Sequence, residues 1–398
     1  MPVQRPRGTA FALTAGQERL VAEVRELARE VLAPLARAGP PGRVNRELVA
    51  ALGEHGLLPR LFPRSAGGTA DHAMSALDLC LHREALAQES TEAETALALQ
   101  GLGAHPILSA GSEALVRRHV PEVAAGRALA AFALSEEGAG SDAAGLELAA
   151  ERDGRGFRLT GAKQWISNAP DADVYTVFAR TTPGARARGI TAFAVPAGAP
   201  GLGGEPIELL SPHPIGRLEF DGVPVGAGQV LGQVDGGFGV AMRTLDLFRP
   251  SVGASAVGMA QAALDLAVAH AATRRAFGAP LRSFQAVSHR LAEMATRTEA
   301  ARLLVYAAAS RYDAGGGPRP AGGADGVTRA SAMAKLYATE TAQAVVDAAV
   351  QVHGASALVR GHPLEHLYRD VRAARIYEGT SEIQRAVIAR ELFQAGPG

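Results

Sequence analysis

The chain is poor in features that several classes of protein require. Its 398 residues include one cysteine, Cys80, which excludes an intramolecular disulfide and a cysteine-rich zinc site. Basic and acidic residues number 40 each, so the excess of positive charge that binds nucleic acid is missing. The long uncharged run at 95–112 is interrupted by glycines, His105 and Pro106, and the N-terminus lacks the apolar stretch of a signal peptide. We therefore expect a soluble, cytoplasmic protein that binds neither nucleic acid nor a membrane.

Two residue types are rare enough to draw notice where they occur. Only two of the 40 basic residues are lysine, Lys163 and Lys335, and the others are arginine. We interpret the arginine excess as genome composition and expect both lysines to be solvated side chains. Trp165 is the only tryptophan, and a lone tryptophan usually packs in a core or at its edge.

The predicted elements are helical, then β, then helical, and the length suggests two to four domains. In 17–35 apolar residues recur at spacings of four, three and four, which predicts a helix that Pro34 and the Gly/Pro cluster at 39–42 close. Further helices are expected at 45–58, 75–90 and 112–125. We place an N-terminal helical domain at 1–129, a middle β domain at 130–239 and a C-terminal helical bundle at 240–398.

The β-favouring runs of the middle domain are short and are separated by turn residues. Their spacing predicts an antiparallel sheet rather than alternating βαβ units. After Gly239 the helical period returns, and four long amphipathic helices imply a bundle. The Gly/Pro-rich segment 313–326 is predicted to be a flexible loop, and Ser381 with Gln384 a capping box that opens the last helix. The fold class is mainly α with a β domain.

Two segments of the β domain combine glycine, hydroxyl and aromatic residues. FALSEEGAGSD at 132–142 has glycines that let backbone N–H groups approach an anion or a ring, with Ser135 and Ser141 as hydroxyl donors. GAKQWISNA at 161–169 holds Trp165, and in a regular strand Ser167 lies on the same face. An acidic surface turn and a packed tryptophan would explain these residues separately; a wall for a planar cofactor would explain them together.

Two C-terminal segments carry charged residues at helix junctions. TRRAFGAPLRSFQ at 273–285 has arginines that either reach a phosphate or are solvated. YRDVRAARIYEGTSEIQR at 368–385 places Glu378 between two helices. Glu378 is there either a helix-capping anion or a general base that Ile376 and Tyr377 shield from water.

Three other patterns do not predict a site. GGFG at 236–239 neither follows a clear strand nor opens a βαβ unit, so a dinucleotide-binding loop is not expected. His353, His362 and His366 have metal-like spacing, but no cysteine is near them and Pro363 separates the last two, so we expect no metal. The sequence also lacks the Gly-x-Ser-x-Gly nucleophile elbow.

In this order and on this layout, the four segments resemble the acyl-CoA dehydrogenase flavoprotein family over nearly the whole chain. The resemblance implies FAD, an acyl-CoA or acyl-carrier-protein substrate, electron-transfer flavoprotein or a similar acceptor, and a homotetramer. It implies that Ser135 donates to the isoalloxazine edge, that 273–285 reaches the partner subunit's FAD, and that Gln351 approaches the adenosine part. The implied cofactor contacts are Phe132, Ser135, Gly140, Ser141, Trp165, Ser167, Arg274, Phe277, Gln285, Gln351, Gly354, Thr380 and Glu382.

The resemblance also implies the chemistry. Glu378 aligns with the family's commonest base, which takes the α-proton of an acyl thioester while the flavin accepts hydride from the β-carbon, giving a 2-enoyl thioester. Relatives with the base on the earlier helix carry it just before the equivalent of Arg249, where this chain has Phe248. The implied substrate contacts are Ser141, Asp246, Arg249 and Gly379.

The chain departs from the family pattern at two places. Glu137 stands where proline is usual, and Ala355 and Ala357 replace glycines, so two methyl groups could narrow the approach to the adenosine of FAD. A carrier-protein-linked dehydrogenase, a flavin oxidase or monooxygenase, and a non-catalytic scaffold stay open as alternatives. Glu378 and Arg249 argue against the scaffold.

Overall fold

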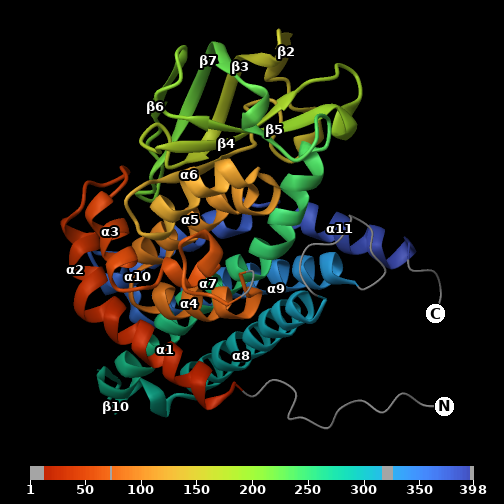
Figure 1. The fold of residues 1–398 in the computed structure, drawn as a ribbon. Helices are drawn as coiled ribbons and strands as arrows, with labels where there is room; N and C mark the ends of the chain where they lie inside the picture. Colours follow the sequence, from red (N-terminus) through yellow and green to blue (C-terminus); the bar gives the residue numbers. More distant parts are fainter. Residues whose placement is uncertain (1–12, 72–73, 316–325, 395–398) are drawn as a thin grey trace, which may run out of the picture.

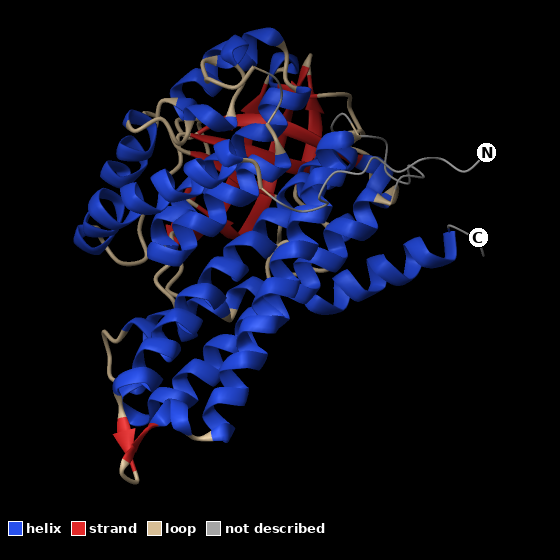
Figure 2. Cartoon of the chain, turned by 90° about the horizontal axis from the view of Figure 1, so that it is seen from below, coloured by secondary structure: helices blue, strands red, loops and turns tan. Residues whose placement is uncertain are grey.

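The computed structural model describes residues 13–71, 74–315 and 326–394, which follow the predicted order of helices, sheet and helices (Figure 1). The large sheet lies at one end of the molecule, and the C-terminal helices extend away from it (Figure 1, Figure 2). The predicted fold class is confirmed. Most of the predicted flexible loop, 316–325, lies outside the described residues, as does the extreme N-terminus.

Side-chain caps begin most of the N-terminal helices. Thr14 and Gln17 form a capping box, and Asn45 accepts from the backbone N–H of Leu48 at 3.0 Å. The helix predicted over 17–35 passes Pro34 through a π-helical turn at 28–32 and ends at Ala38, with Gly39 of the predicted Gly/Pro cluster as its C-cap. These helices are α1 Ala15–Leu27, α2 Ala33–Ala38, α3 Arg46–Glu54, α4 Ala76–Glu89, α5 Thr91–Ala110 and α6 Glu113–Ala124.

The described sheet has the strand order β6-β7-β3-β2-β4-β5-β8, with β1 beside β4. Most pairs are antiparallel as predicted, but β1 and β2 each run parallel to β4, so the antiparallel prediction is wrong for these pairs. The physical reason is that no hairpin joins the partners of these pairs: β3 and its flanking loops lie between them in the chain, and a long connection leaves strand direction free. The strands are β1 Ala130–Ala133, β2 Ala149–Asp153, β3 Gly156–Ser167, β4 Val174–Arg180, β5 Ile190–Pro196, β6 Leu202–Pro206, β7 Ile215–Val225 and β8 Val230–Leu231.

Of the C-terminal helices, α8, α9 and α10 pack on α7, which also contacts α4, and α11 packs on α9. Among the described helices, α7 alone is long and apolar enough to cross a membrane by length and composition, but 67% of its apolar window is buried in the protein. A helix that is apolar on all sides is expected at the centre of a bundle. The elements are α7 Gly237–Thr273, β9 Arg275–Ala276, β10 Ala279–Pro280, α8 Gln285–Ala314, α9 Val327–His353, α10 Pro363–Val371 and α11 Ser381–Gln394.

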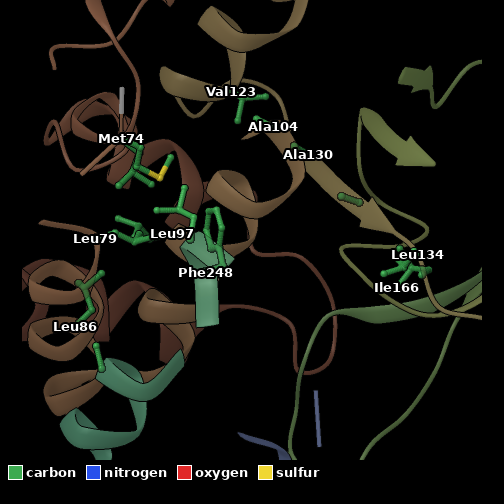
Figure 3. Packing of buried hydrophobic residues seen from close by; sticks show 14 of the residues in the cluster. Met74, Leu79, Leu86, Leu97, Ala104, Val123, Ala130, Leu134, Ile166 and Phe248 are labelled. Carbon is green, nitrogen blue, oxygen red and sulfur yellow. The ribbon is translucent and has the colours of Figure 1, made fainter. Parts of the chain in front are cut away.

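One hydrophobic cluster joins the helices to the sheet. Figure 3 shows Phe248 of α7 beside Leu97 of α5, and Leu134 beside Ile166 where β1 and β3 end, with Ala130 between the two groups. Elements that pack this closely hold one another in fixed positions. The segments that carry the site therefore stand on a shared core.

Candidate active site

The two segments predicted to face a flavin meet where β1 ends against β3. The backbone N–H of Gln164 donates to the carbonyl oxygen of Ser135 at 3.0 Å. Phe132 is partly buried at the same edge and packs on Phe178, with ring centroids 4.9 Å apart. The structure thus brings together residues that are about thirty positions apart in the sequence.

Lys163 fixes this junction and is fully buried, so the prediction of a solvated lysine is wrong. Its Nζ donates to the carbonyl oxygen of Leu134 at 2.9 Å and to Oε1 of Glu136 at 2.7 Å. Glu136 also accepts from the N–H groups of Glu147 and Leu148 at 2.6 and 2.9 Å. Burial lowers the pKa of Lys163 to about 8 although Glu136 opposes the shift. The pair holds both ends of the glycine-rich loop.

Trp165 interrupts the strand on which it lies. Its φ is 62°, and the register of β3 against β7 shifts between Lys163 and Ile166. The alternation that predicted a common face for Trp165 and Ser167 is therefore broken by a bulge. Trp165 is 49% exposed, and the hydroxyl of Ser167 lies 2.8 Å from Nε2 of His213.

The glycine-rich loop offers open backbone beside these side chains. A Cβ placed on Gly140 would meet no atom within 4 Å, and Ser141 is exposed. Ser135 and Ser167 are partly buried nearby, beside the exposed indole of Trp165. An aromatic face, hydroxyl donors and accessible N–H groups at one edge fit a planar ring with polar edges, as a flavin has.

Glu378 lies in a left-handed turn between α10 and α11, and buried side chains from other elements hold that turn. The φ angles of Glu378 and Gly379 are 53° and 93°. Arg249 Nε donates to the carbonyl oxygen of Glu378 at 3.2 Å, and Lys335 Nζ donates to that of Gly379 at 2.8 Å. Gln384 Nε2 donates to both carbonyls, at 3.2 and 3.0 Å. Because all three donors are buried, these bonds fix the backbone of Glu378 and Gly379. The carboxyl group of Glu378 takes part in none of them.

The capping box predicted from Ser381 and Gln384 is wrong by one position. The side chain of Thr380 accepts from the N–H of Ile383 at 3.3 Å and so caps α11, while Ser381 donates to a carboxylate of α9. Gln384 is drawn inward because it bonds the Glu378 turn. Glu382, a predicted cofactor contact, is exposed on the first turn of α11.

The carboxyl group of Glu378 faces inward with one oxygen unpaired. Oε2 is buried and has no hydrogen-bond partner among the described residues. Burial raises the pKa of Glu378, while Arg83, Arg249 and Lys335 oppose the rise. A buried carboxyl with a raised pKa and a free oxygen suits a general base better than a helix cap.

The aromatic and aliphatic shield predicted for this carboxyl is not formed by the single chain. Ile376 is 53% exposed and Tyr377 is 39% exposed. The carboxyl of Glu378 lies near Arg83 of α4 and Arg249 of α7, while Ile376 and much of Tyr377 stay open to solvent. That prediction is therefore wrong for the described chain.

Asp246 and Arg249 lie one turn apart on α7, next to the Glu378 turn. Asp246 Oδ1 lies 3.4 Å from Nη1 of Arg249, and Oδ2 accepts from Thr328 at 3.0 Å. Burial raises the pKa of Asp246. Phe248 is fully buried, with its ring 6.1 Å from that of His105, and takes no part in proton transfer.

The remaining predicted cofactor contacts lie at the opposite end of the bundle from the sheet. There the rings of His270 and His353 stack at 4.1 Å, which joins the end of α7 to the end of α9. Figure 2 shows the β9–β10 hairpin at the tip of the bundle, far from the large sheet. Within one chain, these predicted cofactor contacts do not lie near the Glu378 turn. The group comprises Arg274, Phe277, Gln285, Gln351 and Gly354, all exposed.

The two alanines that replace glycines near this group differ in their surroundings. Ala355 is exposed, whereas Ala357 is fully buried. The methyl group of Ala357 thus packs in the interior. Only the methyl group of Ala355 faces outward. The expectation that both methyl groups narrow the approach to the adenosine of FAD is therefore wrong for Ala357.

The histidines with metal-like spacing serve other contacts. No group of three or more metal-binding side chains occurs among the described residues. His353 and His362 pack ring against ring at 5.5 Å. His366 Nε2 lies 3.1 Å from carboxylates of both Glu92 and Asp370, and these bonds raise the pKa of His366 to about 10.

Sequence reasoning gave no role in the site to five polar residues that support it, Arg83, Lys163, His213, Lys335 and Gln384. The two lysines gave a signal, since they are the only ones in an arginine-rich chain, and Gln384 was expected in a capping box instead. Arg83 and His213 became visible only through their contacts.

The comparisons with known proteins agree with this geometry. Residues 14–127, 131–223 and 235–393 match the models of the N-terminal, middle and C-terminal domains of acyl-CoA dehydrogenase. The chain belongs to the acyl-CoA dehydrogenase family, and it is an oxidoreductase of that class.

Individual relatives cover nearly the whole chain. The cyclohexane-1-carbonyl-CoA dehydrogenase of Geobacter metallireducens is 36% identical over 96% of this chain and 98% of its own length. The structure of butyryl-CoA dehydrogenase from Megasphaera elsdenii is 34% identical, with a TM-score of 0.89 over 96% of this chain and 99% of that one. An FAD complex of PigA is 27% identical, with a TM-score of 0.88 over 97% and 100%. The cofactor of the family, and of this chain, is FAD.

Proposed function

We propose that the protein catalyses the α,β-dehydrogenation of an acyl-CoA, with Glu378 as the base that takes the α-proton. The observation that carries this proposal is the buried, unpaired Oε2 of Glu378 on a turn whose two carbonyls are clamped. A helix-capping carboxylate would instead accept from backbone N–H groups at the start of α11, and Thr380 fills that role.

The residues of the chain account for the proton-transfer half of the reaction. The C–H bond at the α-carbon breaks, its proton goes to Glu378, and the electron pair forms the double bond to the β-carbon. Arg83, Arg249 and Lys335 favour the ionised carboxyl before the reaction, and burial favours the protonated one after it. When bound, FAD supplies the acceptor for the hydride that leaves the β-carbon.

The cofactor is proposed to lie along the edge that carries Ser135, Trp165 and Ser167. The open loop at Gly140 and Ser141 gives this edge accessible donors. Asp246 and Arg249 are proposed to face the thioester from α7. Gly379 and Thr380 follow the base on its turn, and Glu382 lies on the first turn of α11; all three are proposed to contact substrate or cofactor.

A homotetramer is part of the proposal because the chain separates its cofactor contacts. Arg274, Phe277 and Gln285 lie at the tip of the bundle, and Phe277 is 97% exposed. A second copy could bring this tip to its neighbour's FAD. An electron-transfer flavoprotein as acceptor and a cytoplasmic location are proposed from the family resemblance and the composition.

The test is an absorbance scan of the purified protein followed by anaerobic dye reduction across acyl-CoA lengths. A yellow protein that reduces dye with an acyl-CoA supports the proposal. Reduction only by acyl groups on a carrier protein, or turnover with oxygen and no dye, would favour the carrier-linked or oxidase alternative. A flavin-bound protein that no acyl thioester reduces would contradict the proposal.

A further inference from the structure

His213 lies against Ser167, the serine proposed to face the flavin. The two groups are 2.8 Å apart, from Oγ of Ser167 to Nε2 of His213. His213 lies in the connection between β6 and β7, outside every segment that the sequence singled out. Nothing in the proposed reaction uses it.

The backbone around His213 is fixed on both sides. Asn168 donates its N–H to the carbonyl oxygen of Pro214 at 2.8 Å, and Ile215 pairs with Ser167 in the sheet. Residues 213–215 are thus joined to residues 167–168 through both backbone and side-chain hydrogen bonds. His213 has little freedom to leave Ser167.

Contacts to α10 hold the other side of this connection. Ser211 donates to Oδ1 of Asp370, and Arg369 Nη1 donates to the carbonyl oxygen of Leu210 at 3.3 Å. Asp370 in turn bonds His366. The connection that carries His213 is therefore tied to the C-terminal helices as well as to β3.

A hydroxyl has one proton, so its partner decides where that proton points. Burial lowers the pKa of His213 to about 4, and the neutral ring has one N–H. When Nε2 carries this proton it donates to Ser167, whose own O–H is then free to donate outward. When Nε2 is bare it accepts from Ser167 and the outward donor is lost.

We propose that His213 is a positioning residue that turns the hydroxyl of Ser167 toward the flavin as a donor. The inference rests on the proposed function, because it needs FAD beside Ser167. A donor at the flavin edge stabilises the electron-rich reduced ring, as hydrogen bonds to flavins generally do. Losing it makes the flavin midpoint potential more negative.

The test compares His213→Leu, His213→Gln, Ser167→Ala and the double variant His213→Leu/Ser167→Ala, with His55→Leu as the control. His55 is exposed at the end of α3. FAD content, visible spectrum and midpoint potential are measured on the purified proteins. Glutamine can still donate from a similar position, so His213→Gln is expected to keep the wild-type potential.

The expected result is a more negative potential in His213→Leu and Ser167→Ala, and no further shift in the double variant. Flavin reduction by substrate should slow about two- to tenfold, as one hydrogen bond predicts. If His213→Leu loses FAD, His213→Asn replaces it, because the shorter amide does not reach Ser167.

Two results would overturn the inference alone. The first is an unshifted midpoint potential in FAD-bound His213→Leu or in the His213→Asn variant that replaces it. The second is a potential shift in the double variant that equals the sum of the shifts of the two single variants. A wild-type protein without FAD would overturn the proposed function, and this inference with it.

Discussion

Lys335 Nζ lies 2.8 Å from the carbonyl oxygen of Gly379, the residue after the proposed base. Lys335 is fully buried in α9, and burial lowers the pKa of its ammonium to about 8, while Glu378 opposes the shift. A buried cation next to a buried carboxyl thus both holds the turn and acts on the charge of Glu378.

Lys335→Met is expected to move the pH profile of flavin reduction to higher pH. The variant keeps the length of the side chain but removes one cation that lowers the pKa of Glu378. Rapid mixing with acyl-CoA at several pH values measures the profile. Lys163→Met is the matched control, because Lys163 is equally buried but serves the glycine-rich loop. A profile that shifts equally in both variants would contradict a specific role for Lys335.

The wild-type rate of flavin reduction should rise with pH. Burial raises the pKa of Glu378, so the carboxyl stays protonated, and cannot accept the α-proton, up to a pH above the usual range for glutamate. The rate of flavin reduction therefore increases as the pH rises through the raised pKa of Glu378. Anaerobic rapid mixing at saturating substrate checks this. A rate that falls with pH over that range would argue against a carboxylate base.

Arg274→Ala is expected to weaken FAD retention, because Arg274 is proposed to contact the partner subunit's cofactor. A lost bond to a charged group is worth about 1.5–3 kcal/mol, or roughly 10- to 150-fold in Kd. Dilution followed by measurement of free flavin gives the affinity. Arg290→Ala, exposed on α8, is the control. Equal retention in the two variants would show that the tip of the bundle does not reach a cofactor.

His366→Asn should destabilise the protein at pH 6 and much less at pH 10. Asp370 and Glu92 raise the pKa of His366 to about 10, so the stabilising charge is fully present below its unfolded pKa of 6.5 and is lost as pH rises through about 10. The expected loss at pH 6 is about 1.5–3 kcal/mol. Chemical denaturation at both pH values measures it, and a difference that does not shrink at pH 10 would contradict a charged His366.

The sequence predicted the order of elements and most of the segments that meet at the site, because periodicity and glycine chemistry are local. It could not predict that Lys163 and Lys335 are buried, since burial depends on segments far along the chain. The bulge at Trp165 and the parallel pairing of β1 with β4 are set by neighbouring strands rather than by the residues concerned. The contact of His213 with Ser167 joins the connection between β6 and β7 to the end of β3 and follows no motif.

Anaerobic rapid mixing of Glu378→Gln with an acyl-CoA tests the proposed base most directly. Glutamine keeps the shape of the side chain but cannot take the proton, while the clamp on the backbone carbonyls is unchanged. FAD content should equal that of the wild type and of Glu23→Gln, an exposed control on α1. Flavin reduction should slow by about 10²–10⁴-fold while the thioester still perturbs the flavin spectrum. Reduction at close to the wild-type rate would contradict the account and move the search for the base to Asp246.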